Sequence, residues 1–260
     1  MIIHDILFSS IRCGMEKDIP NTELSMEECN SLLEISIDQS ILPIVYRGLK
    51  QMTVPVQSLS QFDRAWIRNV FWHSQHQEAL RKITSALDDA EIPYVPLKGA
   101  VLQYLYLDPN MRKSGDIDIL TREEDLDRAV HAIEENAGFS YVQRNYHDVN
   151  MTNSRVVLGL HFSIKENMEN IDRLLSKAWD YTEPTGEGYR YSFTPEYQVF
   201  HVIAHMSYHL VHGGLGIRPF LDLWLLKNRP TSMKMRSERC VMIAESSRFM
   251  RKAMSSLMHG

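Results

Sequence analysis

Apolar residues recur with a helical period through the first third of the chain. Ser25 precedes acidic residues and then an apolar run, which is the pattern of a capped amphipathic helix. A short helix is predicted over residues 38–50, and a long one, either continuous or broken, over residues 59–90. Residues 1–85 are therefore predicted to form a helical N-terminal region.

From Ile92 onward the pattern changes to alternating strands and helices. The sequence predicts a short buried strand over residues 92–97, a glycine turn, and a helix over residues 100–107. Acidic residues and isoleucine then alternate over residues 116–120, which is the period of a strand because successive side chains point to opposite faces.

A further helix is predicted after this acidic strand. Thr121 is its expected N-cap, acidic residues fill its first turn, and Gly138 is its expected stop. Strands are predicted over residues 139–144, 147–151 and 155–164, separated by Asn, Asp and Ser turn residues. These elements indicate a small mixed sheet with helices packed on it.

The last part of the chain returns to a helical pattern. A loop is predicted over residues 181–191, and Thr194 with the following proline marks a helix start. That helix is expected to end at a glycine pair, and another is predicted over residues 218–227, with a helical remainder. The predicted class is α+β, a small mixed β-sheet core over residues 86–180 flanked by helical regions at residues 1–85 and 181–260.

Asp116 and Asp118 are the residues with the clearest chemical meaning. On a strand they project from one face, about 6.6 Å apart, while the intervening isoleucine turns into the core. Two carboxylates this close raise each other's pKa unless a cation lies between them. Magnesium suits such a pair, because it binds through one or two carboxylates together with substrate phosphates. The plainer alternative is a strand edge with two solvated acids.

The segment before these acids favours phosphate binding. Gly99 allows a phosphate to approach the backbone, the predicted helix from Ala100 offers N-terminal amides, and Lys98 adds a positive charge. A solvated lysine at a strand end is the alternative for Lys98. A phosphate cradle followed by a metal-binding acid pair makes chemical sense as one site.

These motifs together resemble those of the nucleotidyltransferase superfamily related to DNA polymerase beta. More narrowly, they are similar to an uncharacterised bacterial nucleotidyltransferase family that carries Lys-Gly in place of the usual Gly-Ser. The resemblance extends over residues 80–228. The residues that carry it are Pro96–Gly99, Arg112, Asp116–Leu120, Gly138–Phe139, Leu160–Phe162 and Arg218–Leu223.

The resemblance implies an active site and a reaction. Asp116 and Asp118 would be catalytic and would bind Mg²⁺, or Mn²⁺. The nucleotide-binding residues would be Lys98, Gly99, Ala100 and Arg112. The substrate would be a nucleoside triphosphate, with ATP as the first candidate, and the nucleotidyl group would pass to a hydroxyl on an unknown acceptor. His161, His205, Arg218 and Asp222 would line the cleft.

Gly159 departs from the family pattern. Nucleotidyltransferases of this superfamily usually place a third carboxylate two residues before the position of His161, and glycine cannot replace it. Glu166 or Asp148 could substitute from elsewhere. The alternative function is a catalytically weak or inactive nucleotide-binding or interaction module.

Four histidines lie at helical spacing within residues 201–212. An i, i+4 histidine pair can bind zinc, but the glutamate that accompanies such a motif is missing here. We expect a structural role and no stoichiometric zinc, with a metallohydrolase as the weaker alternative. The histidines are His201, His205, His209 and His212.

Composition narrows the classes of partner. The chain has 260 residues, 44% of them hydrophobic and 23% charged, as in an ordinary globular protein. A net charge of −5 disfavours non-specific nucleic-acid binding on electrostatic grounds. No membrane-spanning run or signal peptide is predicted, and 3 separated cysteines are typical of thiols in a reducing compartment. A cytoplasmic location is therefore expected.

Overall fold

The computed structural model describes residues 3–16 and 22–228. Its α-helices are α1 (Ile3–Glu16), α2 (Met26–Asp38), α3 (Leu42–Leu49), α4 (Val56–Asp89), α5 (Gly99–Leu102), α6 (Leu126–Ala137), α7 (Glu169–Leu175), α8 (Pro195–His212) and α9 (Arg218–Asn228). Short 3-10 turns lie at Gln103–Leu105, Pro109–Met111, Glu123–Asp125 and Ala178–Tyr181. The predicted helical remainder, and Cys240, lie outside the described residues.

A five-stranded mixed sheet forms the centre of the molecule, in the order β1-β2-β5-β4-β3. Its strands are β1 (Tyr94–Pro96), β2 (Ile117–Thr121), β3 (Ser140–Arg144), β4 (Asp148–Thr152) and β5 (Val157–His161). The β2–β5 pair is parallel, and the other pairs are antiparallel. The α+β class predicted from the sequence is confirmed.

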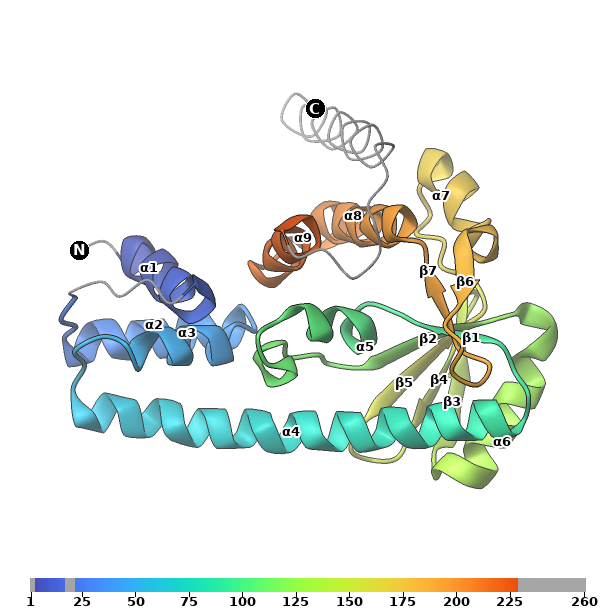
Figure 1. The fold of residues 1–260 in the computed structure, drawn as a ribbon, viewed down its shortest axis with the longest axis horizontal. Helices are drawn as coiled ribbons and strands as arrows, with labels where there is room; N and C mark the ends of the chain where they lie inside the picture. Colours follow the sequence, from blue (N-terminus) through green and yellow to red (C-terminus); the bar gives the residue numbers. More distant parts are fainter. Residues whose placement is uncertain (1–2, 17–21, 229–260) are drawn as a thin grey trace.

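Helices cover both faces of this sheet. On one face, the second half of α4 and helix α6 pack against the strands through buried residues such as Ile83, Ile119 and Ile133. On the other face, α7 and α8 pack against Leu120 and the loop after β5. In Figure 1, α4 runs along the whole length of the molecule, from the N-terminal helices to the sheet.

The N-terminal helices share a hydrophobic core with α8 and α9. Ile6, Leu32 and Phe62 belong to the same cluster of buried residues as Met206 and Leu225. The helical regions at the two ends of the chain therefore support each other, and they lie side by side in Figure 1. The division into three regions remains a prediction.

Two helix starts have the expected caps. The Ser25 side chain accepts a hydrogen bond from the backbone N–H of Glu28, whose carboxylate accepts one in return from the Ser25 backbone. The Thr194 side chain accepts from the backbone N–H of Tyr197 at the start of α8. Gly138 ends α6 in the left-handed conformation, with φ at 71°.

Other boundaries differ from the prediction. Helix α4 is continuous over 34 residues, because tertiary packing along its length supports it without a break. The helix predicted over residues 100–107 ends after Leu102 and continues only as a 3-10 turn. Thr121 is buried at the end of β2 and caps no helix.

The loop predicted over residues 181–191 contains strands that sequence reasoning missed. Strand β6 (Thr182–Pro184) pairs with β7 (Tyr191–Phe193) as a two-stranded antiparallel hairpin. Tyr94 in β1 forms an isolated bridge with Arg190, which ties this hairpin to the central sheet. Such short pairings depend on distant partners, so their local sequence pattern is weak.

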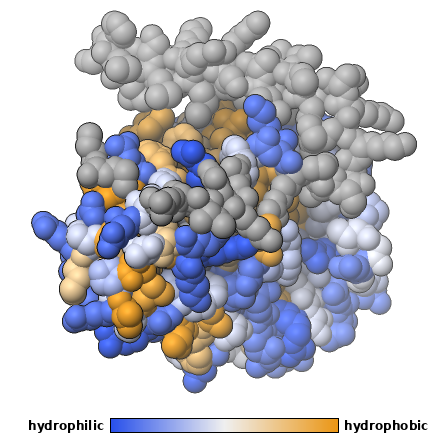
Figure 2. Space-filling model, turned by 60° about the vertical axis from the view of Figure 1, so that its left-hand side comes forward, coloured by the Kyte–Doolittle hydropathy of each residue, from blue (hydrophilic) through white to orange (hydrophobic). Residues whose placement is uncertain are grey.

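The surface over the N-terminal helices is mainly polar with small apolar patches (Figure 2). Exposed apolar residues on α4 include Val56, Ile67 and Phe71. Within residues 3–16 and 22–228, no helix combines the length and apolar character that a membrane span requires.

Candidate active site

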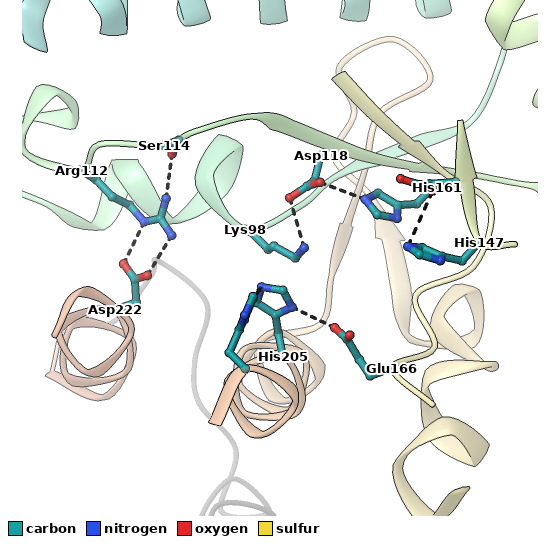
Figure 3. A network of polar contacts seen from close by, with 11 residues as sticks. Lys98, Arg112, Ser114, Asp118, His147, His161, Glu166, His205 and Asp222 are labelled. Carbon is teal, nitrogen blue, oxygen red and sulfur yellow. Dashed lines mark hydrogen bonds and ion pairs between the residues drawn. The ribbon is translucent and has the colours of Figure 1, made fainter. Parts of the chain in front are cut away.

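Asp118 is held between two nitrogen groups at the centre of the sheet. Its Oδ2 lies 3.2 Å from Lys98 Nζ, and its Oδ1 lies 2.9 Å from His161 Nε2. Lys98 comes from the turn before α5, while His161 ends the strand that pairs with β2 (Figure 3). Two sequence-predicted residues, Lys98 and His161, therefore meet at the carboxylate of a third, Asp118.

The two acids of the motif have opposite electrostatic environments. Burial alone would raise the pKa of Asp118, but the charge of Lys98 and the hydrogen bond with His161 outweigh it and hold the pKa well below its usual range. Asp116 precedes β2 and is exposed to the cleft. Desolvation and then the negative charge of Asp118 raise the pKa of Asp116. Asp116 is therefore the acid that would gain most from an added cation.

The turn at Lys98 and Gly99 is sterically constrained. Lys98 has φ at 40°, a left-handed conformation that is costly for a residue with a side chain. A Cβ at Gly99 would lie 2.2 Å from Ser114 Oγ, so only glycine fits beside this segment.

Helix α5 offers less to a phosphate than the sequence predicted. It has only 4 residues, and the backbone N–H groups of Ala100 and Val101 donate to the carbonyls of Leu97 and Lys98. The Ala100 side chain is buried. The positive charge of Lys98 is thus the main anion-attracting feature of this turn.

A cavity of about 550 Å³ opens in front of these acids. One side carries Lys98, Asp116 and Asp118, and the other carries residues of α8 and α9, including His205 and Arg218. Its size falls within the range typical of small-molecule sites. The cavity therefore lies between the sheet and the C-terminal helices.

A buried ion pair joins the two sides of this cavity. Arg112 donates from Nε and Nη2 to the two carboxylate oxygens of Asp222, at 2.9 and 2.8 Å, and Tyr106 donates to Oδ1 at 2.8 Å. Arg112 Nη1 donates to Ser114 Oγ at 2.9 Å. Arg218 donates to the backbone carbonyl of Lys113. These contacts fix α9 against the segment that leads into β2.

A second polar chain begins on α8, beside this cavity. His205 Nδ1 lies 2.8 Å from Glu166 Oε1, and His205 Nε2 lies 2.9 Å from His209 Nε2. Burial, followed by the positive charges of Lys98 and His209, lowers the pKa of His205 to about 2. His205 is therefore neutral at pH 7 and donates its Nδ1–H to Glu166.

Comparison with known proteins identifies the family. A family model described as an uncharacterised nucleotidyltransferase matches residues 25–259. The chain belongs to this family. Membership places it among the nucleotidyltransferases, as its acidic strand and glycine turn predicted. A search of curated protein sequences finds no match.

Two solved structures are similar in fold to this nucleotidyltransferase. One is a solution structure of the antibiotic-resistance factor ANT(2'')-Ia, with 14% identity and a TM-score of 0.49, covering 71% of this chain and 96% of that one. The other is a crystal structure of ANT(2'')-Ia in complex with adenylyl-2''-tobramycin, with 14% identity and a TM-score of 0.47, covering 67% of this chain and 99% of that one.

Gly159 lies directly opposite Asp118 in the parallel pair of β2 and β5. A Cβ at Gly159 would lie 3.0 Å from Asp118 Oδ1 and 3.1 Å from His161 Nε2. The His161 imidazole therefore occupies the space into which a side chain at this position would project. Gly159 is the position at which the family pattern predicts a third acid.

The donor set suits a hard divalent cation. Asp116 provides an exposed carboxylate with a raised pKa, and Asp118 lies two residues further along the same segment. Lys98 Nζ is the charge that balances Asp118, so a cation bound by both acids would share Asp118 with Lys98 or displace it. These residues fit the magnesium that the sequence predicted.

The structure brings most of the sequence-predicted residues to one place. Those that line the 550 Å³ cavity are Lys98, Gly99, Arg112, Asp116, Asp118, His205, Arg218 and Asp222. His161 lines a neighbouring cavity of about 150 Å³, which it shares with Lys98 and His205. Of the four histidines of α8, which together form the α8 stripe, His201 is buried and His212 is exposed at the end of the helix.

His147 is a residue of this region that sequence reasoning missed. It precedes β4 and lines the 150 Å³ cavity together with His161. The only local signal is a histidine beside an acid at a strand start, which is too common to indicate a site.

Proposed function

We propose that this nucleotidyltransferase binds a nucleoside triphosphate with magnesium, or manganese, in the 550 Å³ cavity and transfers its nucleotidyl group to a hydroxyl acceptor. The observation that carries the proposal is the meeting of Lys98, Asp116 and Asp118 at one wall of that cavity. ATP is the first nucleotide to test. The acceptor stays open, because no residue of the cavity points to one class of hydroxyl.

Each wall residue has a proposed part in nucleotide binding. Lys98 would neutralise phosphate charge, and the Gly99–Ala100 turn, whose glycine packs against Ser114, would hold this lysine at the cavity wall. Arg112 would act through Nη1, the guanidinium nitrogen that Asp222 does not bind. Asp116 and Asp118 would hold magnesium, which would supply positive charge against the triphosphate and its pyrophosphate leaving group.

We further propose that His205 orients the attacking hydroxyl by accepting a hydrogen bond from it. Glu166 fixes the ring with Nδ1 protonated, so the lone pair is on Nε2, where His209 now donates. His209 is exposed and can be displaced by an acceptor hydroxyl. As the hydroxyl oxygen bonds to the α-phosphorus and the bond to pyrophosphate breaks, the proton would pass to solvent, because the low pKa of His205 lets Nε2 accept the hydrogen bond but not keep the proton.

Binding and turnover can be measured separately. Isothermal titration with ATP and GTP in the presence of magnesium tests the site, and a pyrophosphate-release assay with glycerol or water as acceptor tests transfer. We expect magnesium-dependent triphosphate binding and a low rate of release. His205→Gln should retain nucleotide affinity and lose about 10-fold in release rate, because the acceptor hydroxyl is no longer oriented. Absence of magnesium-dependent binding would rule out the proposed function.

Gly159 supports a second candidate function. Without a third carboxylate opposite Asp118, the cavity could bind a nucleotide without turning it over. The protein would then be a nucleotide-dependent interaction module. Tight binding of magnesium and ATP without pyrophosphate release from any tested acceptor would favour this candidate.

A further inference from the structure

We infer that His147, Asp148 and His161 form a second metal site, distinct from the acid pair, that binds one zinc ion. Each residue offers one ligand atom, and the three atoms all lie within 4.8 Å of one another. Two imidazoles and one carboxylate are a typical protein ligand set for zinc with an open fourth position. This site goes beyond the proposed nucleotidyl transfer and does not depend on it.

The backbone brings these residues together from two strands. Asp148, the first residue of β4, lies opposite His161, the last residue of β5, in their antiparallel pair. Directly opposite residues in such a pair share a face of the sheet, so both side chains lie on the same side. The His147 carbonyl accepts hydrogen bonds from the N–H groups of Phe162 and Ser163, which anchors it beside them.

The tautomer of His161 leaves a lone pair in the cluster. Asp118 is ionised, so the 2.9 Å contact of its Oδ1 with His161 Nε2 requires a proton on that nitrogen. Metal binding requires the neutral ring, in which Nδ1 carries the lone pair, and this nitrogen is buried without a hydrogen-bond partner in the described structure. His161 is 92% buried, since only 8% of it is exposed. An unpartnered lone pair in such surroundings is costly unless it binds something.

A carboxylate behind a ligating histidine is the usual arrangement at zinc sites. The partner fixes the ring orientation and increases the basicity of the ligand nitrogen. Asp118 has this relation to His161, and Asn145 Nδ2 similarly holds the Asp148 carboxylate at 2.8 Å. The two predicted ligands thus have supporting contacts before any metal binds.

The remaining distances also suit a metal. His147 Nε2 lies 3.7 Å from Asp148 Oδ1, too long for a hydrogen bond. Two ligands of one tetrahedral zinc, each about 2.0–2.1 Å from the ion, lie roughly 3.4 Å apart. A small approach of the side chains would therefore complete the site. The 150 Å³ cavity lined by both histidines leaves room for a water as fourth ligand.

The predicted absence of zinc concerned a different set of histidines. That expectation concerned the α8 stripe, where His205 and His209 contact each other and His205 also contacts Glu166. The new site lies at the ends of β4 and β5 and shares no residue with the stripe. The inference revises the expectation that the whole protein carries no stoichiometric zinc.

The test is metal binding by the full-length, untagged protein. After treatment with a chelator and dialysis, Zn²⁺ is titrated calorimetrically, and Co²⁺ is followed by its visible absorption. We expect one ion per chain. His147→Ala and His161→Ala should each weaken binding by about 100-fold or more, and Asn145→Ala, which removes no ligand, by about 10-fold. Circular dichroism in excess chelator checks that each variant is folded.

Matched controls separate this site from other donors. His131→Ala removes an exposed histidine that is paired with Glu135. The stripe variant, His205→Ala with His209→Ala, removes the two histidines of the α8 stripe that contact each other. Asp116→Asn removes the exposed acid of the nucleotide site. All three should still bind one zinc. No binding by the parent protein, binding unchanged by His147→Ala and Asn145→Ala, or loss only in the stripe variant would overturn the inference.

Discussion

Gly159 and Asp118 face each other across the parallel pair of β5 and β2, with only 3.0 Å between Asp118 Oδ1 and the position of a Cβ at Gly159. The chain therefore lacks a side chain where the family pattern places a third acid. The imidazole of His161 fills the space and contacts Asp118 at 2.9 Å.

Restoring the third carboxylate should raise turnover at a cost in stability. Gly159→Ala is the matched control, because its methyl group crowds His161 without adding charge. We expect either substitution to lower the free energy of unfolding by about 1–3 kcal/mol through overpacking. Gly159→Glu should release pyrophosphate faster than Gly159→Ala under the same conditions. Equal rates would show that this position does not limit catalysis.

Loss of either acid of the motif should weaken nucleotide binding that depends on magnesium. Asp116→Asn and Asp118→Asn each remove a carboxylate facing the cavity, and we expect affinity for magnesium and ATP to fall about 10- to 100-fold in titration calorimetry. Asp127→Asn is a control, since this α6 carboxylate is 98% exposed. If the double variant at positions 116 and 118 binds as well as the parent, the site assignment is wrong.

Lys98 should discriminate triphosphate from nucleoside. In Lys98→Met, affinity for ATP should fall about 10-fold or more, while affinity for adenosine stays unchanged, because the lost charge acts on phosphate. Lys113→Met removes an exposed charge at the same cavity and should have a smaller effect. Equal losses for ATP and adenosine would argue against phosphate contact.

Stability provides a second measurement on Lys98. Because Lys98 Nζ lies 3.2 Å from buried Asp118, we expect the melting temperature of Lys98→Met to fall below that of the parent. An unchanged melting temperature would show that the contact with Asp118 does not stabilise the fold.

The Arg112–Asp222 pair should be important for stability. Arg112 is 5% and Asp222 3% exposed, so Asp222→Asn leaves a buried guanidinium without its bidentate partner. We expect the free energy of unfolding to fall by about 3–5 kcal/mol in urea denaturation. Replacing both residues by apolar ones of similar size should cost less than Asp222→Asn alone. A double variant less stable than the single one would contradict this account.

Buried histidines should make the fold less stable in mild acid. Burial, then the charges of Lys98 and His205, holds the pKa of His201 well below its ordinary value, and that of His205 is about 2. Below about pH 6.5 these two histidines bind protons in the unfolded chain but stay neutral in the folded chain. Stability is therefore fully present above this pH and is lost as the pH falls.

The contribution of His201 can be isolated by substitution. Denaturation at pH 7, 6 and 5 should show a shallower loss in His201→Gln than in the parent, by up to about 1.4 kcal/mol per pH unit below pH 6. His131→Gln, at a side chain that is 72% exposed, should follow the parent. Identical pH dependence in parent and His201→Gln would show that His201 is protonated in the folded state.

The sequence by itself determined the features that depend on local pattern. Alternation around Asp116 and Asp118 identified the acidic strand, and the helix starts at Ser25 and Thr194 have the predicted caps. These signals are readable because side-chain period and capping involve residues only a few positions apart. The same local motifs were enough to indicate the nucleotidyltransferase family.

Only the tertiary structure decided which of these residues meet. The contact of Lys98 with Asp118 spans 20 positions of the chain, and the contacts of His205 with Glu166 and of Arg112 with Asp222 span 39 and 110. No local pattern encodes such pairings. The first arises when the turn before α5 packs beside β2, and the other two arise when α8 and α9 fold back over the sheet. The His147–Asp148–His161 cluster likewise exists only through the register of β4 and β5.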